Sequence, residues 1–177
     1  MSISRRKLIF RGLGAISGGA FCKGADTPVR SETVNAKENE TFFKLYPVGE
    51  VKRQRGSTEL RIFDRYRDAL KGLDGFSHLL VLYWFDRNDT PEKRNILQVH
   101  PRGNKNNPLT GVFACRAPVR PNLIALSRCK VLSIRNEIVT VDKIDALDGS
   151  PILDIKPYIP FIDYETKGVR VPDWLKE

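Results

Sequence analysis

The sequence contains few of the residues that build metal centres and disulfide frameworks. Its 177 residues include three cysteines, two histidines and one methionine. Cys22, Cys115 and Cys129 are odd in number and show no Cys-x-x-Cys spacing, so neither a disulfide framework nor a metal site is predicted. We interpret Cys115 and Cys129 as small core residues, because a free cysteine packs like a small hydrophobe.

Long apolar runs, internal repeats and a Gly-x-Gly-x-x-Gly fingerprint are also absent. That fingerprint marks dinucleotide-binding βαβ units, so a fold of that class is not indicated. A helix that spans a bilayer needs about 20 apolar residues. The apolar stretch near the N-terminus, residues 8–21, is shorter and is interrupted by glycine. We therefore expect no permanent membrane anchor.

The overall composition is that of one globular domain with an unevenly placed charge. The chain is 41% hydrophobic and 29% charged, close to the averages of globular proteins, and its length leaves room for a single domain with tails. Of the net charge of +9, residues 1–30 carry +5, from six basic residues and one acid. The rest of the chain is only mildly basic, so charge alone does not indicate a nucleic-acid-binding domain.

The N-terminal segment carries a pair of adjacent arginines. Arg5 and Arg6 precede the apolar stretch 8–21, an order similar to that of a twin-arginine export signal. We predict a signal or disordered leader at 1–25 and a polar linker at 26–42. The expected localisation is therefore export through the twin-arginine machinery. The alternative is a basic, disordered arm on a cytoplasmic protein.

After the linker, short strands alternate with turns rich in Gly, Pro and Asn. The predicted strands are 59–62, 79–85, 131–134, 138–141 and 151–155. Residues 135–137 are typical of a hairpin turn, and Lys156-Pro157 is expected to end the last strand. Residues 64–73 have helical spacing. The predicted fold is mainly β, a single small β-barrel domain at 43–165 with one short helix, followed by a tail at 166–177.

Three loops combine turn-forming residues with functional groups. They are residues 100–108, which begin with His-Pro-Arg-Gly, residues 111–122, which contain two arginines, and residues 145–160. Binding sites are usually built on loops that a rigid sheet positions. We therefore expect these loops to form the functional site.

These loops, in this order, resemble the TrmO family of tRNA methyltransferases. The family shows a His-Pro-Arg-Gly loop, a Gly-Val-Phe-Ala stretch with an arginine, an Arg-Pro-Asn turn, and Asp-Gly-x-Pro followed by Asp-Ile-Lys-Pro-Tyr. The matching segments are 73–78, 100–103, 111–116, 120–122 and 148–160. The resemblance covers roughly residues 48–163, which is nearly the whole predicted domain.

The resemblance implies a barrel that binds S-adenosyl-L-methionine near a homodimer interface and methylates N6 of the threonylcarbamoyl-adenosine of tRNA. The positions that match cofactor-binding positions are Arg87, Asn88, Arg116, Leu126, Asp142, Lys143, Ile144 and Asp145. The matching substrate-binding positions are Arg102, Arg120, Asn122, Lys156 and Tyr158. Arg116 suits the ligand carboxylate, and Asp145 or Asp142 suits the ribose hydroxyls. The implied partners are a second copy of the chain and, for a cytoplasmic protein, tRNA.

Ordinary structural roles compete with several of these assignments. Arg102 and Arg120 are equally compatible with ion pairs to surface carboxylates. For His100, a side chain that braces its own loop is a better interpretation than a general base. For His78, the better interpretation is a packing residue at the start of a strand. The aromatic residues at 83–85 are expected to be core residues rather than a surface on which nucleic-acid bases stack.

The chain also departs from the family pattern. Cys115, Ala117, Leu123 and Ala125 stand where the family usually has Thr, Ser, Pro and Gly, and Asp86 stands where histidine is common. An alanine in place of glycine is costly if the backbone requires a positive φ. These departures leave a second hypothesis open, an exported, non-catalytic relative that binds S-adenosyl-L-methionine or another small ligand. No general base is predicted.

Overall fold

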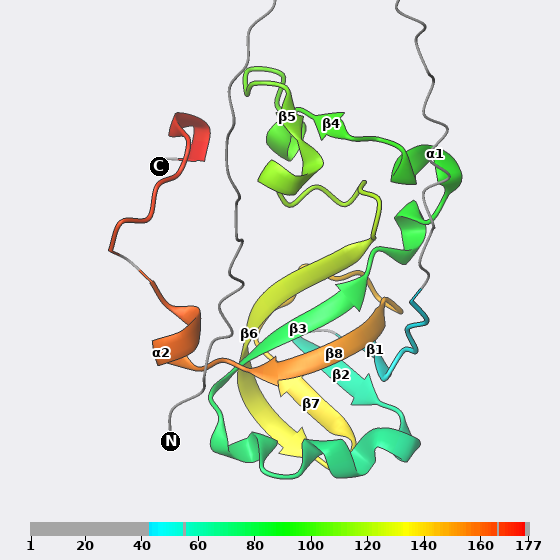
Figure 1. Ribbon diagram of the computed structural model, residues 1–177. Coiled ribbons are helices and arrows are strands. Elements are labelled where there is room, and N and C mark those ends of the chain that lie inside the picture. Colours follow the sequence, from blue (N-terminus) through cyan, green and yellow to red (C-terminus); the bar gives the residue numbers. More distant parts are fainter. Residues whose placement is uncertain (1–42, 55, 166, 176–177) are drawn as a thin grey trace, which may run out of the picture. The chain divides into compact units, whose positions relative to one another are not determined.

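The computed structural model describes residues 43–177 apart from residues 55, 166, 176 and 177 (Figure 1). The predicted leader at 1–25, the predicted linker at 26–42 and Cys22 lie outside the described residues. Within the described residues, no helix has the length and hydrophobicity that crossing a membrane requires.

Six antiparallel strands form a closed barrel in the order β1-β2-β7-β6-β3-β8 (Figure 1). They are β1 (Gly49–Gln54), β2 (Ser57–Ile62), β3 (His78–Trp84), β6 (Ile124–Arg135), β7 (Ile138–Val141) and β8 (Pro151–Pro157). Closure pairs each strand with two neighbours and so removes the free edges of an open sheet. The prediction of a mainly β barrel is confirmed.

The core lies inside this barrel and is built by alternate residues of the strands. Along β3, Leu79, Val81 and Tyr83 are buried and the residues between them are half-buried, because successive side chains of a strand point to opposite faces. β3 pairs with β6 on one side and β8 on the other, as expected for an internal strand. Leu60 of β2 and Ile152 of β8 are fully buried in the same core.

The predicted hairpin is present between β6 and β7. Arg135 pairs with Ile138, and Asn136 between them has a φ of 52°, a left-handed value that asparagine tolerates better than most residues. β6 begins at Ile124, seven residues before the predicted start. The sequence pattern concealed this part of the strand because its inward residues include the small Ala125 and Cys129 rather than large apolar side chains.

The helices differ from the prediction of one short helix. The expected helix at 64–73 is a 3-10 helix, η1 (Asp64–Leu70), followed after Gly72, with a φ of 81°, by η2 (Leu73–Gly75). A residue with positive φ cannot continue a right-handed helix, so the segment divides there. The further short helices are η3 (Asp86–Asn88), α1 (Pro91–Arg94), η4 (Pro101–Gly103), η5 (Val112–Ala114), α2 (Pro160–Asp163) and η6 (Asp173–Leu175).

Residues 85–123, between β3 and β6, extend beyond one end of the barrel (Figure 1). They contain a two-stranded sheet, β4 (Gln98–Val99) and β5 (Thr110–Gly111), and four of the eight short helices of the described residues. Two of the three predicted functional loops lie here. The last strand, β8, ends at Pro157, two residues later than predicted, with the proline as its final residue.

Candidate functional site

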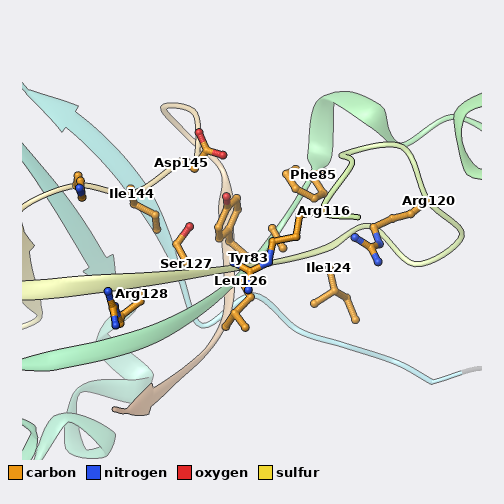
Figure 2. A pocket seen from close by; sticks show the side chains of 12 residues that line it. Tyr83, Phe85, Arg116, Arg120, Ile124, Leu126, Ser127, Arg128, Ile144 and Asp145 are labelled. Carbon is orange, nitrogen blue, oxygen red and sulfur yellow. The ribbon is translucent and has the colours of Figure 1, made fainter. Parts of the chain in front are cut away.

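A cavity of about 560 Å³ lies where β3 ends and β6 begins (Figure 2). It is lined by Tyr83, Phe85, Arg116, Arg120, Ile124, Ala125, Leu126, Ser127, Arg128, Lys143, Ile144 and Asp145. Five of the eight expected cofactor-binding residues are in this lining: Arg116, Leu126, Lys143, Ile144 and Asp145. They come from three separate segments, and the antiparallel β6–β7 hairpin places the last of these segments beside the first half of β6.

The lining is rich in positive charge. Four basic side chains, Arg116, Arg120, Arg128 and Lys143, face the cavity with one carboxylate, that of Asp145. Within the described part of the chain, neither Arg116 nor Asp145 forms an ion pair or a side-chain hydrogen bond. In Figure 2 these two side chains are seen on either side of Tyr83. Both groups are therefore free to bind a polar ligand.

Arg53 of β1 holds the loop that carries Asp145. Its Nε donates to the carbonyl of Ala146 at 2.9 Å, and its Nη2 donates to the carbonyls of Ile144 at 2.7 Å and Ala146 at 2.8 Å. Ile144 and Ala146 are buried while Asp145 between them is exposed. The clamp therefore fixes the backbone on both sides of Asp145. Sequence reasoning missed Arg53, because its partners lie more than 90 residues away along the chain.

Asp142 braces the start of the same loop and does not line the cavity. Its Oδ1 accepts hydrogen bonds from the backbone N–H groups of Lys130 at 2.8 Å and Lys143 at 2.7 Å. Desolvation acts to raise the pKa of Asp142, but these hydrogen bonds outweigh it and hold the pKa below its usual value. Of the two carboxylates expected near the ribose, the structure thus leaves Asp145 facing the cavity.

Tyr83 forms a wall of the cavity and is itself almost fully buried. Burial raises the pKa of its hydroxyl and the charge of Asp145 raises it further, whereas the hydrogen bond with Ser127 acts in the opposite direction. The hydroxyl consequently stays protonated at neutral pH and is a donor. The Tyr83 ring packs edge-on against Phe85, with centroids 5.7 Å apart, as expected for core aromatic residues.

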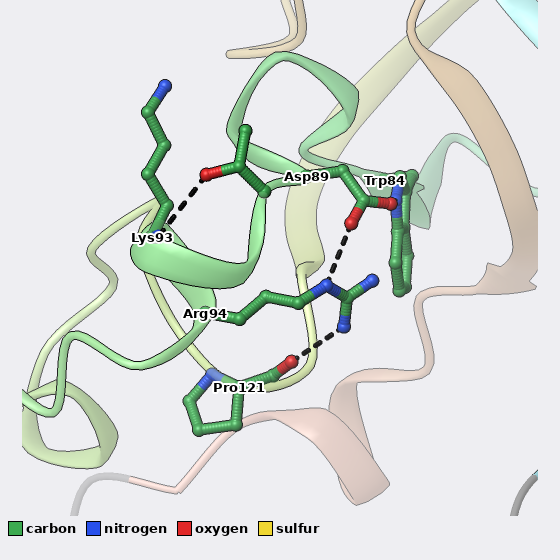
Figure 3. A network of polar contacts seen from close by, with 6 residues as sticks. Trp84, Asp89, Lys93, Arg94 and Pro121 are labelled. Atoms are coloured by element: carbon green, nitrogen blue, oxygen red, sulfur yellow. Dashed lines mark hydrogen bonds and ion pairs between the residues drawn. The ribbon is translucent and has the colours of Figure 1, made fainter.

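A polar network fixes the loop that carries Arg116 and Arg120 (Figure 3). Arg94 of α1 donates from Nε to Asp89 at 2.7 Å and from Nη1 to the carbonyl of Pro121 at 2.8 Å. Its guanidinium lies 5.3 Å from the centroid of the Trp84 ring, and Trp84 Nε1 donates to Asp89 at 3.0 Å. The hydrogen bonds from Arg94 and Trp84 hold the pKa of Asp89 below its usual value.

Of the other expected site residues, Arg120 lines this cavity and the rest lie outside it. Arg87 and Asn88 are on η3, Asn122 precedes β6, and Lys156 of β8 pairs with Asp154 at 2.6 Å. The ring of Tyr158 lies 5.5 Å from the guanidinium of Arg128, which does line the cavity. Arg102 lines a second cavity. In the described residues neither Arg102 nor Arg120 is in an ion pair with a carboxylate.

The structural roles expected for the histidines are confirmed. His100 donates from Nδ1 to the carbonyl of Asn107 at 2.8 Å and so braces its loop. His78 is the first residue of β3, where its Nδ1 lies 2.9 Å from Ser77 Oγ and its ring meets Tyr158 edge-on.

The cysteines differ from each other. Cys129 is buried in the core, and burial raises its pKa to about 12. The assignment of Cys115 to the core was wrong, because this residue is half-buried and lines the second cavity. Both thiols are free, and no group of three or more His, Cys, Asp or Glu among the described residues is arranged to hold a metal.

The alanine at 125 is compatible with the barrel. Among the described residues, Arg102 and Asn136 are the non-glycine positions with positive φ, so Ala125 carries no left-handed strain. It lies within β6 opposite Tyr83, where an extended backbone accepts any side chain small enough to fit. The expected penalty for replacing glycine there does not arise.

Comparison with known proteins agrees with this fold. The family described as the tRNA-methyltransferase O N-terminal domain matches residues 43–164. A probable S-adenosyl-L-methionine-binding protein of Methanocaldococcus jannaschii is 46% identical over 122 residues, which are 69% of this chain and 97% of that protein. The tRNA (adenine(37)-N6)-methyltransferase of Homo sapiens is 39% identical over 103 residues, 58% of this chain and 23% of that enzyme.

A solved structure shows the same fold. The crystal structure of TrmO from Pseudomonas aeruginosa superposes with a TM-score of 0.56 at 26% identity, covering 75% of this chain and 64% of that one. This chain therefore spans somewhat less than two thirds of the TrmO chain and about a quarter of the human enzyme. The family match covers well over half of the chain, and the archaeal relative is matched over nearly its whole length. The chain thus belongs to the tRNA-methyltransferase O N-terminal domain family.

Proposed function

We propose that this protein is an S-adenosyl-L-methionine-dependent methyltransferase that acts on N6 of an adenosine in tRNA, with the threonylcarbamoyl-adenosine as the inherited substrate. The observation that carries the proposal is the first cavity, in which Arg116 and Asp145 face the same space and have no ion-pair partner among the described residues. Relatives named as S-adenosyl-L-methionine-binding proteins and as tRNA adenine methyltransferases support it.

The residues of the cavity fit this cofactor. Its volume of about 560 Å³ lies within the range of about 300 to 1,000 Å³ that small-molecule sites occupy. The Arg116 guanidinium can donate a fork of two hydrogen bonds to a carboxylate, and the Asp145 carboxylate can accept from a ribose diol. Ile124, Leu126 and Phe85 supply apolar surface for an adenine ring.

When bound, the cofactor would supply an electrophilic methyl group: the acceptor nitrogen would take it with its lone pair and release a proton to water, and the electrons of the broken C–S bond would stay on sulfur. The chain contributes orientation, because in-line placement provides much of the rate of such a transfer. Arg116 would hold the carboxylate of the cofactor and Asp145 its ribose diol. The remaining basic side chains, Arg120, Arg128 and Lys143, exceed what one carboxylate needs and are available to RNA phosphate.

The native full-length chain is expected to bind S-adenosyl-L-homocysteine more tightly than S-adenosyl-L-methionine. The demethylated product lacks the sulfonium charge, which the basic lining repels. Titration calorimetry measures both affinities, and mass spectrometry of nucleosides from treated tRNA measures methyl transfer. No binding of either compound at millimolar concentration would refute the cofactor, whereas binding without transfer would favour the non-catalytic relative.

We further propose that the protein acts as a homodimer. Ile124 and Leu126 line the cavity and are 37% and 46% exposed, so the cavity is open on an apolar side that a second copy would cover. Light scattering on the full-length chain at micromolar concentration is expected to give twice the monomer mass. A monomer that still binds the cofactor would show that one chain completes the site.

The second candidate is an exported relative that has lost the transfer step, and the paired arginines of the leader favour it. Export would separate the protein from tRNA. The hydroxyl groups that the family carries at two positions are absent from Cys115 and Ala117. The second cavity contains both positions. Neither residue lines the first cavity, so binding of the cofactor there would persist in such a relative.

A further inference from the structure

A second cavity, of about 750 Å³, lies beside the first, and Arg116 lines both. Two of its walls come from the extension between β3 and β6, from residues 99–103 and residues 113–119. The third wall consists of Trp174 and Leu175 of η6, which follow much later in the chain. The C-terminal segment therefore returns to the extension and closes one side of this cavity.

One side chain anchors this C-terminal segment. We call residues 164–175, which follow α2, the strap. Trp174 is half-buried, and every other described residue of the strap is exposed. The backbone N–H of Leu175 donates to the carbonyl of Pro172 at 3.0 Å, a bond between two residues of the strap itself. The strap is thus held at the cavity mainly by the burial of one indole ring.

An attachment through one side chain is weak. The strap forms no strand of the barrel, and η6 is three residues long. Ordering each residue of the strap costs conformational entropy. Segments with few buried contacts and an exposed backbone open at a low free energy while the core stays folded. The strap can therefore leave the cavity without unfolding of the barrel.

The walls that face Trp174 across the cavity are mostly apolar. They include Val99, Phe113, Pro118 and Val119. Phe113 is 80% exposed even with the strap in place. Removal of the indole would expose more apolar surface to water, so the hydrophobic effect favours the closed position of the strap. The conformational entropy of the strap favours the open position, and the two effects oppose each other.

We propose that the strap is a displaceable cover of the second cavity, with Trp174 as its anchor. In the closed state Trp174 and Leu175 form one side of the cavity, and in the open state that side admits molecules from solvent as far as Arg116. The strap thereby regulates access to a residue that also lines the first cavity. The inference concerns the opening of the second cavity and not its ligand, so its test is independent of the proposed function.

Thiol labelling of the full-length chain measures whether the strap covers the cavity. Cys115 lines the cavity, whereas Cys129 is buried in the core, where its pKa is raised to about 12, and reacts only if the barrel opens. Each protein carries Cys22→Ser, so Cys115 is the thiol expected to react with dithiobis(nitrobenzoate). If about nine tenths of the molecules are closed, Trp174→Ala is expected to raise the labelling rate about 10-fold, because the rate follows the open fraction.

Phe161→Ala is the matched control. It removes an exposed aromatic side chain of α2 that does not line the cavity, and it should leave the labelling rate unchanged. Equal labelling rates in the native chain and in Trp174→Ala would overturn the proposal, as would an equal rise in Phe161→Ala. Labelling of Cys129 in Trp174→Ala would also overturn it, because the strap would then be part of what keeps the barrel folded.

Hydrogen–deuterium exchange of the native full-length chain measures the opening without any substitution. The backbone amides of the strap are expected to exchange much faster than those of β3, which is paired on both sides. Protection of the strap equal to that of β3 would show that the strap opens only with the barrel, and would contradict a displaceable cover.

Discussion

Arg116→Ala in the full-length chain is expected to bind S-adenosyl-L-homocysteine about 10 to 100 times more weakly than the native chain. A hydrogen bond to a charged group contributes about 1.5 to 3 kcal/mol, and each 1.4 kcal/mol corresponds to a factor of ten. The guanidinium has no carboxylate partner among the described residues, so its removal leaves no unpaired acid behind. The loss of affinity therefore measures what the Arg116 guanidinium contributes to binding of the ligand. Titration calorimetry measures it.

Two further variants make this test specific. Arg116→Lys keeps the charge but loses the planar fork, so its affinity should lie between those of the native and alanine forms. Arg135→Ala removes the same charge at the other end of β6, from an exposed residue outside the cavity, and should leave the affinity unchanged. Equal losses in Arg116→Ala and Arg135→Ala would mean that only overall charge matters, and would contradict a site at Arg116.

Replacement of both Arg5 and Arg6 by lysine is expected to abolish translocation if the leader is a twin-arginine signal. The export receptor recognises the pair of adjacent arginines. Lysine keeps the positive charge but removes the guanidinium geometry. A basic arm that binds nucleic acid through charge would tolerate the same change, since counterion release depends on the number of charges. The substitutions therefore distinguish an export signal that a receptor recognises from a basic tail that binds through charge alone.

Fractionation of host cells that express the native and the double-lysine proteins measures this difference. Export predicts native protein outside the cytoplasm and the variant retained within it. Full-length native protein found only in the cytoplasm would refute export and would leave tRNA accessible as the substrate. A single-lysine control, Arg11→Lys, lies within the apolar stretch and should not change the distribution.

Local patterns were sufficient to predict most of the barrel. The strand at 79–85 was recognised because a continuous apolar run has few alternatives, and the β6–β7 hairpin because Asn136 lies in a short turn between two apolar segments. The start of β6 was not recognised, because its inward residues are small. The α-helical spacing at 64–73 was misleading, because a 3-10 helix interrupted at Gly72 presents its apolar residues at similar intervals.

For the site, the sequence determined which residue types were available and, through the resemblance, which segments were expected to form it. The tertiary structure decided which of them meet. Arg116, Leu126 and Asp145 line one cavity because the β6–β7 hairpin brings the loop after β7 beside the first half of β6. Asp142 was indistinguishable from Asp145 in the sequence, yet in the structure one oxygen of its carboxylate accepts from two backbone N–H groups and the residue does not line the cavity. The clamp by Arg53 depends on carbonyls more than 90 residues away. Backbone periodicity is a property of neighbouring residues, whereas a site depends on where closure and hydrogen bonding place distant ones.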